Sequence, residues 1–207
     1  MLILKLFLRD FRFGAGASSC RVTGLALLLG ALAGCTGLPV VPEAPETFVL
    51  TGKVGVREAD ESFSANLLWH QKGEAFEIDL WGPLGQGRVK LVKKDGEISL
   101  ESAKGVLAQG DPEQVMQTHL GWSLPLDVLP AWVQGAPFPD LPVSGLSEDA
   151  SGNVSGFEQA GWAVVLERYR NVPVGPEAAA TERALPRRVT ATREDARVRL
   201  VISEWRL

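Results

Sequence analysis

The chain has 207 residues, with 21 basic and 25 acidic side chains and a formal net charge of −4 at pH 7. This length is enough for one domain with a core of its own. The acidic balance argues against nucleic acid as a partner and against adhesion to an anionic membrane through a basic patch.

Residues 1–34 have the layout of a secretory signal peptide. Basic residues come first, the run from Val22 to Ala33 carries no charge, and small residues precede a cleavage point. The run is too short to cross a bilayer, which takes about 20 apolar residues. The leader holds four of the basic residues and one of the acidic ones, so its removal leaves 17 against 24 and a net charge of −7.

The leader ends in Leu32-Ala33-Gly34-Cys35, which resembles the bacterial lipobox. The resemblance implies that Cys35 is acylated and becomes the new N-terminus, where several acyl chains give stable anchoring. An ordinary signal peptide followed by a chance cysteine is the alternative. Cys20 lies in the leader, so no thiol remains for a disulfide, a metal or a nucleophile. The lipobox resemblance also implies that an aspartate directly after the cysteine would retain a lipoprotein in the inner membrane. Thr36 stands at this position, which favours the outer membrane, facing the periplasm.

Residues 35–47 contain Pro39, Pro42 and Pro45 and few apolar side chains, which predicts a semi-rigid tether. We therefore expect a signal peptide over 1–34, a lipidated N-terminus and tether over 35–47, and one folded domain over 48–207.

From Phe48 onward, apolar residues alternate with polar or small ones, which predicts antiparallel strands that each have one apolar face. Polar breaks such as 94–96 separate these runs at hairpin spacing. The predicted strands are marked by Phe48–Val56, Phe63–Trp69, Phe76–Leu80, Val89–Leu91, Ile98–Leu100, Trp162–Leu166, Val189–Ala191 and Val198–Ile202. Together they predict one strongly curved sheet.

Two helices are predicted in the middle of the chain. Asp111 is placed to cap the first, Pro112 suits its first position, and the apolar residues up to Leu120 share one face. A second helix is expected from about Asp127 to Gly135. We expect both to cover the concave side of the sheet, with loops over 136–145 and 172–184.

Catalytic motifs are missing. His70 and His119 belong to no metal motif, and each is interpreted as an ordinary solvated or core histidine. Gly85-Gln86-Gly87 begins like a dinucleotide loop, but Lys90 stands where the third glycine should be. No nucleophile elbow or Walker A loop occurs either. We expect no enzyme, no cofactor and no metal. Paired carboxylates for glycoside cleavage are a catalytic alternative that the sequence leaves open.

Short segments spread over nearly the whole mature chain, from Leu50–Val56 to Val201–Trp205, have a recurring order and spacing. They resemble the LolB family, the outer-membrane lipoprotein receptors of the Lol sorting system. Their order and spacing, together with the lipobox, carry the resemblance. The segments are Leu50–Val56, Leu67–Trp69, Gly82–Gln86, Gly121–Leu126, Trp132–Gly135, Gln159–Trp162, Leu185–Arg188 and Val201–Trp205.

The resemblance implies a mainly β fold with a few helices, an incomplete, unclosed antiparallel β-barrel with a helical lid over a hydrophobic cavity. It implies a monomer that accepts triacylated lipoproteins from the periplasmic carrier LolA and inserts them into outer-membrane lipid.

Two groups of candidate site residues follow. Tryptophans and their neighbours on the predicted concave face are expected to line an acyl-chain cavity, namely Leu67, Trp69, Phe76, Ile78, Trp122, Trp132 and Trp162. The turn Trp81-Gly82-Pro83-Leu84-Gly85 joins two strands, and the resemblance implies that Leu84 protrudes and meets the membrane. By the residues alone, Leu84 could equally fold back onto the sheet.

Two alternatives remain open from the sequence. The first is a non-catalytic assembly or scaffold lipoprotein of the outer membrane, whose aromatic residues would fill a solid core. The second is a hydrolase that is itself a lipoprotein and faces the periplasm.

Overall fold

The computed structural model describes residues 47–58, 61–120, 125–175 and 181–207. Cys35 and Trp122 therefore lie outside the described residues. Two short helices are described, α1 (Pro112–Leu120) and α2 (Leu129–Val133). The strands are β1 (Thr47–Glu58), β2 (Glu61–Lys72), β3 (Ala75–Trp81), β4 (Val89–Lys94), β5 (Glu97–Ser102), β6 (Gly105–Gly110), β7 (Val143–Glu148), β8 (Val154–Gln159), β9 (Trp162–Glu167), β10 (Arg170–Val174), β11 (Thr181–Leu185), β12 (Arg188–Arg193) and β13 (Ala196–Arg206).

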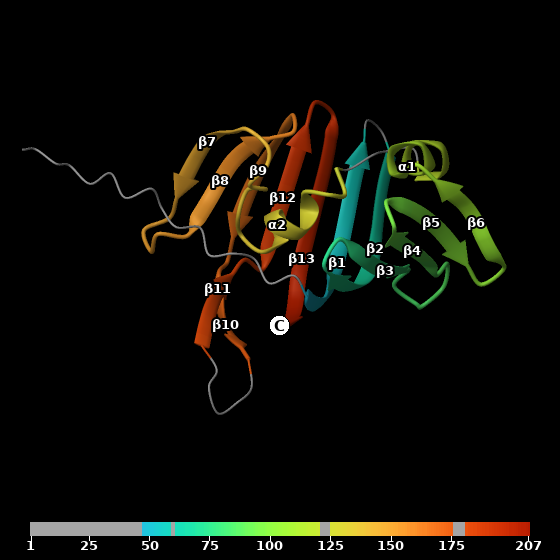
Figure 1. Ribbon diagram of the computed structural model, residues 1–207, viewed down its shortest axis with the longest axis horizontal. Coiled ribbons are helices and arrows are strands. Elements are labelled where there is room, and N and C mark those ends of the chain that lie inside the picture. The colour runs from blue at the N-terminus through green and yellow to red at the C-terminus, as the bar shows by residue number, and fades with distance from the viewer. Residues whose placement is uncertain (1–46, 59–60, 121–124, 176–180) are drawn as a thin grey trace, which may run out of the picture. The chain divides into compact units, whose positions relative to one another are not determined.

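Eleven strands form one sheet in the order β6-β5-β4-β3-β2-β1-β13-β12-β9-β8-β7. Every neighbouring pair is antiparallel. Strands β1 and β13, which are the first and last described strands along the chain, pair with each other in the middle of the sheet. The edge strands β6 and β7 are not paired with each other, so the sheet stays open, as Figure 1 shows. The predicted mainly β fold with an unclosed antiparallel sheet is confirmed.

Alternation along the strands places the core on one face of the sheet. In β9, Trp162, Val164 and Leu166 are buried and the residues between them are exposed. The register then sets neighbours side by side, since Val164 is opposite Ala191 of β12 and Ala191 is opposite Val198 of β13. We call the face that carries these side chains the inner face.

Both helices contribute to the core. The carboxylate Oδ1 of Asp111 accepts a hydrogen bond from the backbone N–H of Gln114 at 3.1 Å, so the predicted cap of α1 is confirmed. Helix α1 packs against β5 and β6, and Figure 1 shows it beside these strands. Helix α2 is shorter than predicted, and its residues Ala131, Trp132 and Val133 are buried.

Two predicted loops are wrong in part. The expected loop over 172–184 contains most of a two-stranded sheet, formed by β10 and β11. Only Val172 and Leu185 are buried in these strands, so no alternation of apolar residues marks them. Strand β10 also contains Pro173, and proline is tolerated in an edge strand. The expected loop over 136–145 ends early, because β7 begins at Val143, and β7 has no buried residue.

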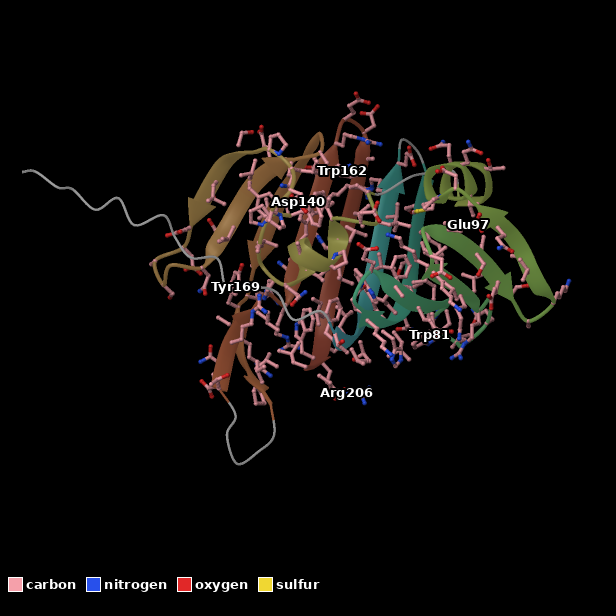
Figure 2. All side chains as sticks on the ribbon, in the orientation of Figure 1. Trp81, Glu97, Asp140, Trp162, Tyr169 and Arg206 are labelled. Atoms are coloured by element: carbon pink, nitrogen blue, oxygen red, sulfur yellow. The ribbon has the colours of Figure 1, made fainter. Side chains whose placement is uncertain are left out.

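Tyr169 is half-buried between β9 and β10, and its hydroxyl donates a hydrogen bond to the carbonyl oxygen of Val154 at 2.6 Å. Figure 2 shows it beside β10 and β11, whereas Trp162 lies at the opposite end of β9. Burial, together with the charge of Asp149, raises the pKa of Tyr169 above its ordinary value. The neutral phenol is therefore favoured by the fold.

The pKa of Tyr169 is higher in the folded state than in the unfolded state, where it is about 10. The stabilisation that this difference gives is fully present below pH 10, and it is lost as the pH rises through the folded pKa. We expect the free energy of unfolding to fall above about pH 10. Tyr169→Phe should cost about 1 kcal/mol at neutral pH through the lost hydrogen bond. The variant should also show a shallower alkaline decline in denaturant titrations at several pH values. Parallel alkaline curves for both proteins would contradict this assignment, since Tyr169 is the chain's single tyrosine.

Candidate apolar cavity and exposed loop

A cavity of about 100 Å³ lies between the inner face of the sheet and both helices. Each of its 18 lining residues is apolar, so the wall offers no polar side chain to a ligand. The lining residues are Val54, Phe63, Leu67, Trp69, Ile78, Leu80, Val89, Leu91, Leu100, Met116, Leu126, Leu129, Trp132, Val133, Val189, Ala191, Val198 and Leu200.

The two tryptophans of the wall have their polar atoms satisfied elsewhere. The indole Nε1 of Trp69 donates to Gln71 Oε1 at 2.9 Å. That of Trp132 donates to Gln159 Oε1 at 2.9 Å. Both glutamines are buried polar side chains within the core. The indole rings therefore offer the cavity an apolar surface, which suits hydrocarbon.

The structure separates the predicted cavity residues into two groups. Leu67, Trp69, Ile78 and Trp132 lie on the cavity wall. Phe76 is equally buried but packs edge-to-face on Trp69, with ring centroids 6.2 Å apart, and is not among the lining residues.

Sequence reasoning missed part of the wall. Met116 of α1, Leu126 and Leu129 line the cavity from the helical side. Val189 and Ala191 of β12 line it from the sheet. The period of two had already marked this strand, so its residues could have been assigned to the cavity by their face.

Trp162, also predicted for the cavity, borders two other hollows of about 600 and 430 Å³. Its ring is 2% exposed, and the guanidinium of Arg193 lies over it, 4.7 Å from the ring centroid. Its indole Nε1 is buried and has no hydrogen-bond partner among the residues that the structure describes. A buried donor left unpaired costs about 1–3 kcal/mol. Trp162 is therefore part of a polar region next to the cavity.

The loop between β3 and β4 projects Leu84 into solvent. The side chain is 90% exposed, so it does not fold back onto the sheet. The backbone N–H of Gly85 donates to the carbonyl of Gly82 at 2.9 Å, and Gly85 has a φ of +82° that suits glycine. Beside this turn the guanidinium of Arg88 lies 5.2 Å from the centroid of the Trp81 ring. The predicted turn, which also contains Pro83, is confirmed.

No cluster of three or more His, Cys, Asp or Glu side chains that could hold a metal ion occurs within 47–58, 61–120, 125–175 and 181–207. Over the same residues, neither helix has the length and hydropathy needed to span a membrane. The features that remain for function are the apolar cavity, the polar hollows beside it and the exposed loop.

Comparison with known proteins shows the family of the chain. A family model described as "Outer membrane lipoprotein LolB" matches residues 46–205, which is most of the chain. The chain belongs to the LolB family. Its relatives in this family include the outer-membrane lipoprotein LolB of Cellvibrio japonicus, 34% identical over 197 residues that cover 88% of this chain and 95% of the relative.

Two further LolB relatives are similar to the chain over most of its length. The protein of Pseudomonas fluorescens is 36% identical over 75% of this chain and 72% of its own length. The protein of Chromohalobacter salexigens is 31% identical over 93% of this chain and 94% of its own length. Among solved structures, a LolA superfamily protein from Nitrosomonas europaea matches with a TM-score of 0.49 and 10% identity, covering 79% of this chain and 87% of that protein.

Proposed function

We propose that this LolB family member receives triacylated lipoproteins from the soluble periplasmic carrier LolA and inserts them into the inner leaflet of the outer membrane. No catalytic step is involved, and the protein acts by binding and release. Family membership supports the outer membrane as the location. The observation that carries the proposal is the wholly apolar cavity under the two helices.

The cavity suits the cargo because acyl chains are costly to expose to water. Three chains of about 15 methylenes each, at about 0.8 kcal/mol per methylene, would cost roughly 35 kcal/mol. Free diffusion of such a lipoprotein across the periplasm is therefore excluded. A hollow lined by 18 apolar side chains lowers this cost for any acyl chain that enters it. A solid-core scaffold would have no use for such a hollow.

The volume of about 100 Å³ is too small for this cargo. Pockets for drug-sized ligands hold about 300–1,000 Å³, and one acyl chain needs a comparable space. The cavity must therefore widen as chains enter. Helices α1 and α2 carry Met116, Leu129, Trp132 and Val133 of the wall, and they are the part that can move away without breaking the sheet. Transfer then runs downhill, from carrier to cavity to bilayer.

The direct test is delivery in vitro. The full chain is reconstituted in phosphatidylethanolamine vesicles and mixed with LolA that carries a labelled lipoprotein. We expect the lipoprotein to float with the vesicles that contain the chain and to stay on LolA with empty vesicles. Lipoprotein that stays on LolA in both samples contradicts the proposal.

Anchoring is a separate part of the proposal and rests on Cys35, which lies outside the described residues. Cys35→Ala is expected to block acylation and processing, so that the precursor keeps its leader and runs as a larger species on a gel. The change in the position of the precursor and the loss of incorporated radioactive palmitate measure this. Cys20→Ala is the matched control, because Cys20 lies in the predicted leader, and it should be processed normally.

A further inference from the structure

The inner face of the sheet changes from apolar to basic at one end of two strands that line the cavity. In β12, Val189 and Ala191 line the cavity and Arg193 follows on the same face. In β4, Val89 and Leu91 line it and Lys93 follows on the same face. A cation therefore borders the cavity on each of these strands, which lie on opposite sides of β1 and β13 in the sheet.

Both cations line one hollow of about 430 Å³. This hollow shares Leu126 with the apolar cavity, so the two spaces adjoin. Trp162 lines it as well, and Figure 2 places this residue at the end of β9. We call Arg193, Trp162 and Lys93 the polar rim.

The polar rim offers hydrogen-bond donors without a full set of acceptors. The indole Nε1 of Trp162 is buried and unpaired among the described residues. Arg193 packs over the Trp162 ring and has no ion pair within the described part of the chain, whereas Lys93 is paired with Asp127. The described geometry thus lacks an oxygen acceptor for the Trp162 indole N–H, and an acceptor reaches this buried group only when the side chains around it move.

We propose that the polar rim binds the ester and amide carbonyl oxygens at the neck of an acylated cysteine while its chains occupy the cavity. This rests on the proposed function of the cavity. The acyl carbonyls lie where the hydrocarbon chains join the glycerol and the cysteine, so chains in the cavity bring these oxygens to its border.

The charges around the polar rim favour a neutral acceptor over a phosphate. The same hollow is lined by Asp111 and Asp127, and the adjoining one by Glu158 and Glu194. A phosphate group placed there would meet these carboxylates at close range, which is repulsive. Carbonyl oxygens carry no net charge and still accept hydrogen bonds from an indole N–H and a guanidinium.

The test compares two photoreactive probes with the full chain in phosphatidylethanolamine vesicles. Each is a triacylated cysteinyl peptide with a diazirine in its acyl chains, and the second has ether linkages in place of the two ester carbonyls. We expect the ester probe to crosslink about tenfold more than the ether probe, as the loss of a hydrogen bond to the buried indole N–H of Trp162 implies. Arg193→Gln and Trp162→Phe should each remove this preference.

Arg199→Gln is the matched control. Arg199 is an exposed arginine of β13 on the face opposite Leu200, which lines the cavity, and this variant should keep the preference. Thermal melting checks that the variants fold, and Arg193→Gln carries the test alone if Trp162→Phe unfolds.

Four results would overturn the inference. If the wild-type chain crosslinks both probes equally, or if Arg193→Gln keeps the preference, the carbonyl site is wrong and the cavity stands. If neither probe crosslinks, the proposed function itself fails. If phosphatidylglycerol added to the vesicles abolishes the preference in the wild-type chain, the polar rim binds an anionic lipid headgroup instead.

Discussion

Leu84→Glu is expected to stop delivery of lipoproteins to the membrane while the fold and the uptake of cargo from LolA stay nearly unchanged. Leu84 is 90% exposed at the tip of its turn, so a glutamate there removes no contact within the protein. Burying one leucine side chain in the bilayer surface contributes about 1.5–3 kcal/mol. This is too little to anchor the domain but enough to orient a domain that is already tethered. Trp81 at the base of the turn suits the membrane interface, where amphipathic rings settle.

The delivery assay separates the two steps. We expect the glutamate variant to take labelled lipoprotein from LolA and to hold it without releasing it into phosphatidylethanolamine vesicles, with a melting temperature equal to that of the wild-type chain. Leu84→Ile and Leu84→Phe should still deliver. Val106→Glu is the matched control, because Val106 is a 62% exposed apolar residue of β6 and is not part of the loop. Delivery by Leu84→Glu at the wild-type rate would show that the loop has no such role.

Most strands of the fold could be predicted because alternation directly reports one buried face. Trp162, Val164 and Leu166 are a clear instance, since each is buried and each neighbour is exposed. The cap of α1 was predictable for a similar reason, because Asp111 followed by proline is a local signal that needs no tertiary contact.

The elements that were missed are those with little buried surface. Strand β7 has no buried residue, and β10 and β11 bury one residue each. Their backbone hydrogen bonds hold them in pairs, and backbone pairing leaves almost no trace in the side-chain pattern.

The sequence predicted which face of the sheet carries the candidate cavity, but not which residues of that face line it. Alternation placed Trp69, Phe76 and Trp162 on the inner face, and all three are buried. Which of them borders the hollow depends on the position along the strand and on the helices above, which a periodic pattern does not encode. Phe76 is paired with Gln71 near the end of β2 and packs behind Trp69.

Ala191→Leu is expected to block the binding of acyl chains while it leaves the protein as stable as before or more stable. Ala191 is 4% exposed and lines the cavity from β12. A leucine adds three carbons at the wall of a hollow of about 100 Å³, and we expect them to occupy that space. Filling a cavity commonly raises the free energy of unfolding by about 0.5–2 kcal/mol. The same atoms occupy the space that an acyl chain has to enter first.

Ala163→Leu is the matched control, because Ala163 is an exposed residue of β9 and adds the same atoms on the outer face. It should change neither stability nor transfer by much. Urea unfolding and transfer of labelled lipoprotein from LolA are measured for both variants, and we expect transfer to Ala191→Leu to fall about tenfold. In a filled core, the extra carbons would instead cost about 1–3 kcal/mol through overpacking and leave transfer unchanged in the folded protein. A hollow that holds acyl chains therefore predicts unchanged or higher stability with reduced transfer for Ala191→Leu. A core that only supports the sheet predicts lower stability with unchanged transfer.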